Sequence, residues 1–236
     1  MKDIGISSLI SYLGFTIIFF IFKRFISSPG TIWIWFFLVI TGIIQFFNNL
    51  YLTHYPEICN GYNITSALTA TIVPWIFIFG LSCVCLVFIP GWLRVFSNTF
   101  GSLVVNWGGL LTTKVNNLFT PTSLTTGPTN PDISKTITEA IQLLYANRIK
   151  FINEVDISDY NETETTITWP SLQNIMDFMN ISLVNKQTQM KELYDILVIK
   201  EDAGYFAWFI LIGSISILVS TNSLLLTSCN AVEFNF

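Results

Sequence analysis

Charged residues are missing from four long stretches of the chain, and these stretches predict its architecture. No Asp, Glu, Lys or Arg occurs in 4–22, 25–56, 58–93 or 203–232, which together make up about half of the sequence. A helix of roughly 20 apolar residues crosses a hydrocarbon core of about 30 Å. The pattern therefore predicts transmembrane helices at about Ile4 to Phe22, Thr31 to Leu52, Ser66 to Ile89 and Ala203 to Leu226.

A fifth charge-free stretch, Val95 to Thr113, is more mixed. Its large apolar residues are interspersed with Ser97, Asn98, Asn106 and three glycines. We expect it to lie along the membrane interface, because amphipathic segments of this kind favour the headgroup zone. A fifth crossing is the alternative, and it would place the following domain on the other side of the membrane.

The composition becomes polar between the third and fourth spans. A linker rich in Thr, Asn and Pro, at 112–131, precedes an amphipathic helix that ends near Phe151, and a second helix begins at Trp169. A last helix begins near Lys186 and can continue into the fourth span as one long helix. The segment 165–169 alternates too briefly to predict a strand.

The sequence thus predicts an all-α integral membrane protein with about four transmembrane helices and a small helical polar domain between spans three and four. Its expected parts are an N-terminal membrane region with three spans at 1–90, an interfacial segment and linker at 91–131, the polar domain at 132–202, and a C-terminal span and tail at 203–236. Buried helices of a soluble protein are the alternative, but helices uncharged over such lengths are hard to keep soluble.

Composition and charge support the membrane assignment. Only 11% of the residues are charged, whereas soluble chains average about 25%. The formal net charge of -4 leaves no basic surplus for a phosphate backbone, so we expect no nucleic-acid partner. Lys23, Arg24 and Arg94 border the spans, so the positive-inside rule places 23–30 and 91–203 in the cytosol and both termini in the lumen.

Candidate catalytic groups are few. His54 is the only histidine, and no matched nucleophile accompanies it, so we expect no enzyme activity, metal, cofactor or small-molecule substrate. The spans contain no charged residue, which argues against a proton relay or an ion pump. The nearest approach to a polar pathway is formed by Gln45, Asn48 and Asn49, which we expect to cap a helix end.

The predicted topology decides which modifications the chain can carry. Cys59 and Cys229 both fall on the lumenal side, just outside spans three and four, where a disulfide could form. Two unpaired thiols are the alternative. Asn161 and Asn180 begin glycosylation sequons, but they fall in the cytosolic part and should remain unused.

Two stretches of the sequence carry a family resemblance. The first is a membrane-interface motif of Pro90, Gly91 and Trp92 followed by Phe96, Asn98, Phe100 and Gly101, directly after a span that contains Pro74. The second comprises 151–154, 193–200 and 206–208, with Asn222 and Cys229. Together they cover about 74–230, and they resemble a membrane protein family of nucleocytoplasmic large DNA viruses, the phycodnavirus and mimivirus group. Arg94-Val95 departs from the family, which often has a proline there.

The resemblance implies a structural role. Viruses of this group have a shell of double jelly-roll capsid protein around an internal membrane derived from the host endoplasmic reticulum. The chain would then be a minor capsid protein in the internal virion membrane, with its polar domain contacting other minor capsid proteins and the major capsid protein. A subunit of a channel or transporter is the alternative, and a thiol oxidoreductase that uses Cys59 and Cys229 is a third.

Overall fold

The described part of the chain divides into two compact units. The computed structural model describes residues 2–24, 31–89, 91–107, 109, 111, 114, 118, 139, 142–143, 147–163, 166–178, 182–183, 185–226 and 229. One unit comprises Met1–Leu93 and Tyr205–Phe236, and we call it the membrane unit. The other comprises Arg94–Gly204, and we call it the polar unit.

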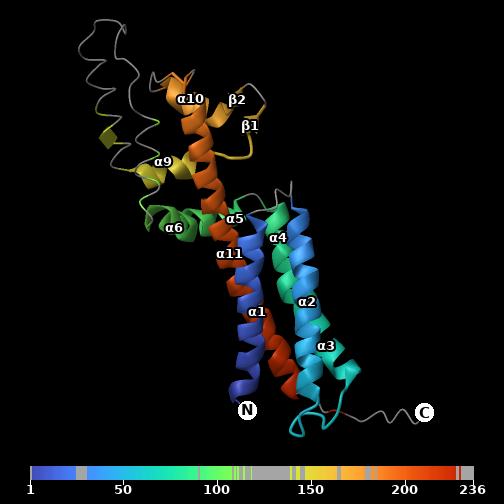
Figure 1. Cartoon of the computed structure of the whole chain (residues 1–236). Helices are drawn as coiled ribbons and strands as arrows, with labels where there is room; N and C mark the ends of the chain where they lie inside the picture. Colours follow the sequence, from blue (N-terminus) through green and yellow to red (C-terminus); the bar gives the residue numbers. More distant parts are fainter. Residues whose placement is uncertain are drawn as a thin grey trace, which may run out of the picture. The chain divides into compact units, whose positions relative to one another are not determined.

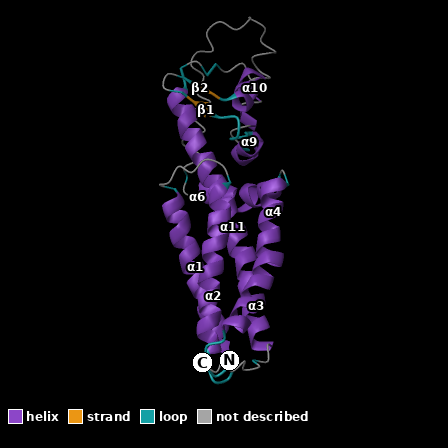
Figure 2. Ribbon diagram, turned by 90° about the vertical axis from the view of Figure 1, so that its right-hand side faces the viewer, coloured by secondary structure: helices purple, strands orange, loops and turns teal. Residues whose placement is uncertain are grey.

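The membrane unit is a helical bundle (Figures 1 and 2). Its helices are α1 (Lys2–Lys23), α2 (Ile32–Thr53), a third rod made of α3 (Ile64–Pro74), η1 (Trp75–Gly80) and α4 (Leu81–Phe88), and the C-terminal part of α11 (Gln187–Leu226). Four helices among the described residues are long and apolar enough to cross a membrane: Gly5–Lys23, Ile32–Thr53, Ile64–Phe88 and Gln187–Leu226. The predicted all-α membrane fold with four spans is confirmed.

Aromatic side chains fill the centre of the membrane unit. The rings of Phe37, Phe79 and Phe209 are fully buried, and their centroids lie 4.8 to 6.2 Å apart. Such aromatic pairs contribute about 0.5–1.5 kcal/mol each beyond their area burial. The Tyr12 hydroxyl donates a 2.6 Å hydrogen bond to the Phe209 carbonyl and so joins α1 to α11.

The third span changes its helical geometry directly after Pro74. Proline has no N–H to donate, so one hydrogen bond of the helix is missing at this position. A wider π-helical turn, η1, follows Pro74. The Trp75 indole N–H reaches across to the Leu38 carbonyl of α2 at 3.0 Å. Gly42 makes this contact possible, because a Cβ at this position would lie 2.9 Å from the indole nitrogen.

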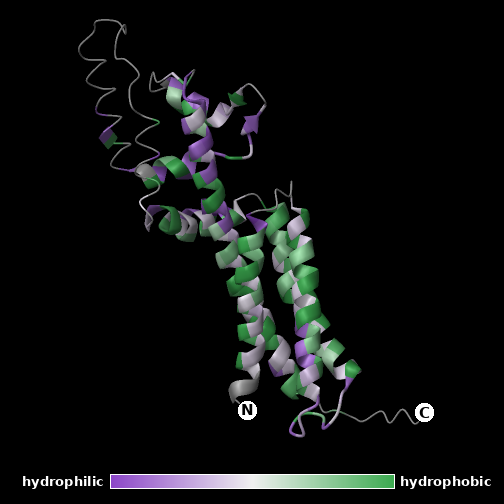
Figure 3. Ribbon diagram, viewed as in Figure 1, coloured by the Kyte–Doolittle hydropathy of each residue, from purple (hydrophilic) through white to green (hydrophobic). Residues whose placement is uncertain are grey.

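The polar unit combines short helices with one small hairpin. Its elements are α5 (Trp92–Phe96, which begins in the membrane unit), η2 (Ser97–Gly101), α6 (Ser102–Trp107), α9 (Arg148–Glu154), β1 (Asn161–Glu162), β2 (Ile167–Thr168), α10 (Pro170–Phe178) and the N-terminal part of α11. The core centres on Trp169, Leu172, Met176, Ile152 and Leu193, all fully buried. Figure 3 shows that hydrophilic residues are far more frequent in this unit than in the membrane unit.

Several expectations for the polar unit can be compared with its structure. Helix α10 begins beside Trp169 as predicted, and α11 is the predicted long helix, 40 residues without interruption. Most of the amphipathic helix expected before Phe151, and most of the linker at 112–131, lies outside the described residues. The hairpin was not predicted. Strands β1 and β2 pair in an antiparallel register, although neither segment shows the alternation of polar and apolar residues typical of a strand. The Gln187 side-chain oxygen accepts the Ile167 N–H at 2.7 Å.

Candidate functional site

The resemblance motif from Trp92 onward lies in one continuous helical segment, Trp92–Trp107, which we call the motif helix. It consists of α5, η2 and α6. Gly91 precedes it with φ +86, a left-handed conformation that glycine adopts without strain. Pro90, the first residue of the motif, lies outside the described residues. At 16 residues the motif helix is not among the helices long enough to span, and the described part of the chain contains no fifth span.

Inside the polar unit the motif helix crosses α11 with its backbone close to that of α11. A Cβ on Gly101 would overlap the Lys200 carbonyl oxygen, and a Cβ on Gly204 would lie 2.7 Å from the Ser97 backbone nitrogen. Small residues on both helices therefore permit this approach, as they do wherever helix backbones pack closely. The crossing requires glycine at both positions.

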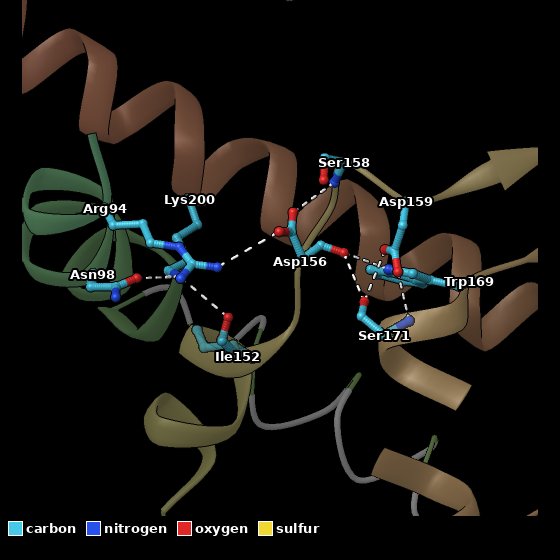
Figure 4. Close-up of polar contacts among 9 residues, drawn as sticks. All are labelled: Arg94, Asn98, Ile152, Asp156, Ser158, Asp159, Trp169, Ser171 and Lys200. Carbon is cyan, nitrogen blue, oxygen red and sulfur yellow. Dashed lines mark hydrogen bonds and ion pairs between the residues drawn. The ribbon is translucent and has the colours of Figure 1, made fainter. Parts of the chain in front are cut away.

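Lys200 lies buried at this crossing, with 6% of its surface exposed (Figure 4). Its ammonium donates to Asn98 Oδ1 at 2.7 Å and to the Ile152 carbonyl at 3.2 Å. Lys200 precedes the charge-free part of α11, which begins at Ala203. Burial, together with the positive charge of Arg94, lowers the pKa of Lys200 from its ordinary 10.5 to about 8. Asn98 of the motif therefore provides a hydrogen-bond acceptor for a buried cation.

A second set of polar contacts joins the loop after α9 to Arg94 and to the start of α10 (Figure 4). The Asp156 carboxylate lies 3.7 Å from the Arg94 guanidinium, and its backbone carbonyl accepts the Trp169 indole N–H at 2.7 Å. Hydrogen bonds from Ser158, with a smaller effect of Arg94, lower the pKa of the Asp156 carboxyl. Asp159 accepts both the N–H and the hydroxyl of Ser171, in the first turn of α10. Arg94 and Asp156 thus add one exposed ion pair beside the buried Lys200.

The other face of the motif helix is apolar and exposed. Ser97, Gly101, Ser102 and Val105 are buried, whereas the exposed large apolar side chains are Trp92, Val95, Phe100, Leu103, Val104 and, at 85% exposure, Trp107. The exposed polar residues of the helix are Arg94, Thr99 and Asn106. Phe96 and Phe100 of the motif stack on each other with centroids 6.1 Å apart. A helix on the surface of a soluble protein usually shows the reverse distribution. This helix instead presents its large apolar side chains outward.

The membrane unit contains a buried polar cluster that corrects one expectation. Gln45 and Asn49 do not cap a helix end, because α2 continues to Thr53 and both side chains are buried. The Asn49 amide donates to Thr71 and to Ser220 at 2.8 Å each, and Gln45 donates to Asn49 at 3.0 Å. The signal was visible in the sequence, since Thr41, Gln45, Asn49 and Thr53 recur every fourth residue on one helix face. The cluster joins α2, α3 and α11.

The two cysteines singled out in the sequence meet in the structure. Cys59 and Cys229 form a disulfide with Cα atoms 5.3 Å apart, between the loop after α2 and the chain just beyond α11. Cys83 and Cys85 are free thiols. His54 stacks on Tyr62, with ring centroids 4.8 Å apart. The described residues contain no group of three or more His, Cys, Asp or Glu side chains that could hold a metal ion.

Comparison of the chain with protein families, with curated proteins and with solved structures finds no match. The function of the chain is therefore inferred from the geometry of each unit and from the motif resemblance.

Proposed function

We propose that this chain is a membrane-anchored structural protein whose polar unit docks onto a protein layer next to the bilayer. The observation that carries the proposal is α11, a single helix that supplies core residues to the polar unit and a membrane span to the membrane unit. Leu193 and Leu197 are buried in the polar unit, and Phe209 and Leu224 in the membrane unit. Each unit therefore buries residues of this one helix.

In this proposal the motif helix is the part of the polar unit that contacts the lipid headgroups. Its outward residues Leu103, Val104 and Trp107 are large and apolar, and Trp favours the membrane–water interface. Its inward residues are fastened to α11 at Gly101 and Lys200. In this proposal the motif helix lies along the bilayer surface with its apolar face in the headgroup zone.

The disulfide supports a topology with the polar unit opposite the cysteines. Cys59 and Cys229 can bond only on the same side of the membrane, so the chain between them crosses an even number of times. The α3–α4 rod and α11 supply two crossings, which leaves no room for a third by the motif helix. Disulfides form in oxidising compartments such as the lumen of the endoplasmic reticulum. The polar unit would then be cytosolic during synthesis.

The viral setting of the proposal is supported by the motif resemblance. In a large icosahedral DNA virus, the cytosolic side of the assembling membrane becomes the side that faces the shell. The polar unit would then contact other minor capsid proteins and the major capsid protein, and the chain would reside in the internal virion membrane. The motif residues Asn98 and Gly101 would serve this role by holding the motif helix on α11.

Cross-linking mass spectrometry of the native assembly tests the proposed docking. Lys150 and Lys191 are exposed lysines of the polar unit and should give links to shell proteins. Lys2, at the start of α1 and lumenal in this topology, provides the internal control and should give no links to shell proteins. Links from Lys150 and Lys191 only to copies of the chain or to other membrane proteins would contradict the structural role.

The topology can be tested independently with the sequon at Asn161, an exposed residue on β1. Translation into microsomes should leave Asn161 unmodified, so Asn161→Gln should not change the effect of endoglycosidase on the mobility of the chain on a gel. A mobility shift that disappears in Asn161→Gln would place the polar unit in the lumen and contradict the topology.

A subunit of a channel or transporter remains the second candidate because of one observation. The bundle contains the buried polar cluster of Gln45, Asn49, Thr71 and Ser220, the kind of intramembrane polar contact that a pathway would use. Single-channel recording of the reconstituted chain tests this role. Conductance that changes in Asn49→Leu would support the channel, and a silent bilayer would favour the structural role.

A further inference from the structure

The outer surface of the membrane unit contains a groove between α1 and α2. Its volume is about 410 Å3, and its floor is formed by Phe15, Phe19, Trp33 and Ile40. Exposed side chains such as Ile18 and Phe36 form its rims. Apart from Lys23, every residue that lines the groove is apolar. Because both helices belong to candidate membrane spans, the surrounding medium that can fill the groove is lipid.

The length of the groove corresponds to one leaflet. On α1 it extends from Phe15 to Lys23, and on α2 from Ile32 to Ile40. Eight residues of helix rise about 12 Å, and half of a hydrocarbon core of about 30 Å is roughly 15 Å. The groove therefore begins at one membrane surface and ends near the bilayer centre, as one acyl chain does.

The surface end of the groove is positively charged. Lys23 ends α1, and its ammonium lies 4.2 Å from the centre of the Trp33 ring, in the first turn of α2. The rings of Tyr205 and Phe20 lie 5.6 and 5.9 Å from the same ammonium. These rings hold the cation beside the mouth of the groove. The partial positive charge of the α2 N-terminus, which begins at Ile32, has the same sign.

We propose that this groove binds one anionic phospholipid, with an acyl chain between α1 and α2 and the headgroup phosphate beside Lys23. An apolar slot one leaflet long selects an acyl chain, and a cation at its mouth selects a negative headgroup over a zwitterionic one. Basic pockets between transmembrane helices bind anionic headgroups in this way. The site belongs entirely to the membrane unit and does not depend on the structural role proposed above.

Native mass spectrometry of the full-length chain in detergent tests the site. The probe is an equimolar mixture of phosphatidylserine and phosphatidylcholine with identical acyl chains. Wild-type protein should retain phosphatidylserine preferentially. Lys23→Gln should reduce that preference about fivefold, the effect of losing one basic side chain near an anionic headgroup, and Lys23→Arg should preserve it.

Matched controls distinguish lipid binding in the groove from non-specific attraction of anionic lipids to basic residues. Arg24→Gln removes the same charge from the neighbouring residue, which does not line the groove, and should change the preference less than Lys23→Gln. Ile18→Trp should obstruct the groove and reduce retention of both lipids, whereas Ile10→Trp, on α1 away from the groove, should not. Equal retention of the two lipids by wild type, equal effects of Lys23→Gln and Arg24→Gln, or unchanged retention in Ile18→Trp would each overturn the proposal.

Discussion

The two units bury polar groups of different kinds. In the membrane unit the buried cluster is neutral, with the Asn49 amide donating to Thr71 and Ser220. The polar unit instead buries cations, among them Lys200, which donates to two neutral oxygens. A charge in lipid costs far more than an amide or a hydroxyl, whereas a buried lysine near water is tolerated when its donors are satisfied. The location of each unit thus limits the polar chemistry that it can bury.

The units also differ in how their glycines permit close packing. A Cβ on Gly213 in the membrane unit would overlap the hydroxyl end of the buried Tyr12 side chain, which could give way only by losing its hydrogen bond to the Phe209 carbonyl. A Cβ on Gly101 in the polar unit would meet the Lys200 backbone, which cannot move without displacing α11. The same substitution should therefore have different consequences in the two units.

We expect the largest effect from Gly101→Ala. The new methyl group must separate the motif helix from α11, and overpacking against backbone costs about 3 kcal/mol or more of the free energy of unfolding. Limited proteolysis of the full-length chain in detergent should show faster cleavage of the polar unit. Gly213→Ala should cost less, and Gly14→Ala, which meets nothing within 4 Å, should be neutral or stabilising. Equal protease resistance of Gly101→Ala and wild type would refute the backbone contact.

Loss of the disulfide should destabilise the membrane unit by about 2–4 kcal/mol, the usual range for a native bridge. The variant is Cys59→Ser combined with Cys229→Ser, and the measurement is the thermal midpoint in detergent with and without reductant. Wild type should lose stability on reduction and the variant should not respond. Cys85→Ser is the control because Cys85 is a free thiol. Both bridged cysteines belong to the membrane unit, so the variant should leave the protease resistance of the polar unit unchanged. Faster cleavage of the polar unit would show that the two units do not unfold separately.

Lys200 should make stability depend on pH in the alkaline range. Its pKa is about 8 in the folded state and 10.5 when unfolded, so between these values the unfolded chain holds a proton that the folded chain has released. Stability should therefore rise as the pH increases from about 8 to 10.5, with a slope of at most about 1.4 kcal/mol per pH unit. Thermal melts across this range should show the rise in wild type and not in Lys200→Met. Identical pH profiles of wild type and Lys200→Met would show that Lys200 does not cause the rise in stability.

Asn49→Leu should have the smallest effect. Hydrogen bonds between membrane helices contribute about 0.6 kcal/mol on average and seldom more than about 1.7. Asn49 donates two bonds and accepts one from Gln45, so their loss should cost about 1–2 kcal/mol. Asn48→Leu is the matched control, because the buried Asn48 amide nitrogen has no hydrogen-bond partner among the described residues. Thermal midpoints in detergent compare the two variants. A larger decrease of the thermal midpoint in Asn48→Leu than in Asn49→Leu would contradict the hydrogen bonds assigned to Asn49.

The spans could be predicted because the absence of charge is a local property of the sequence. The π-helical turn after Pro74 could not, since it depends on where Trp75 finds the Leu38 carbonyl on another helix. The motif residues were identified in the sequence, but the role of Asn98 and Gly101 was not. Their partner Lys200 is about 100 residues away, and no spacing rule connects them. The end of α2 was predicted to within one residue, but Gln45 and Asn49 were misinterpreted because the partners of Asn49, Thr71 and Ser220, lie on other helices.

The disulfide can form only late in synthesis. Cys59 and Cys229 are separated by 170 positions, and Cys229 is synthesised only after α3, α4, the polar unit and α11. In the proposed topology the bond can therefore close only after α11 has crossed the bilayer. During pulse-labelling, its appearance would identify the chains in which Cys229 has reached Cys59, and chains that stall earlier would carry a free thiol at Cys59.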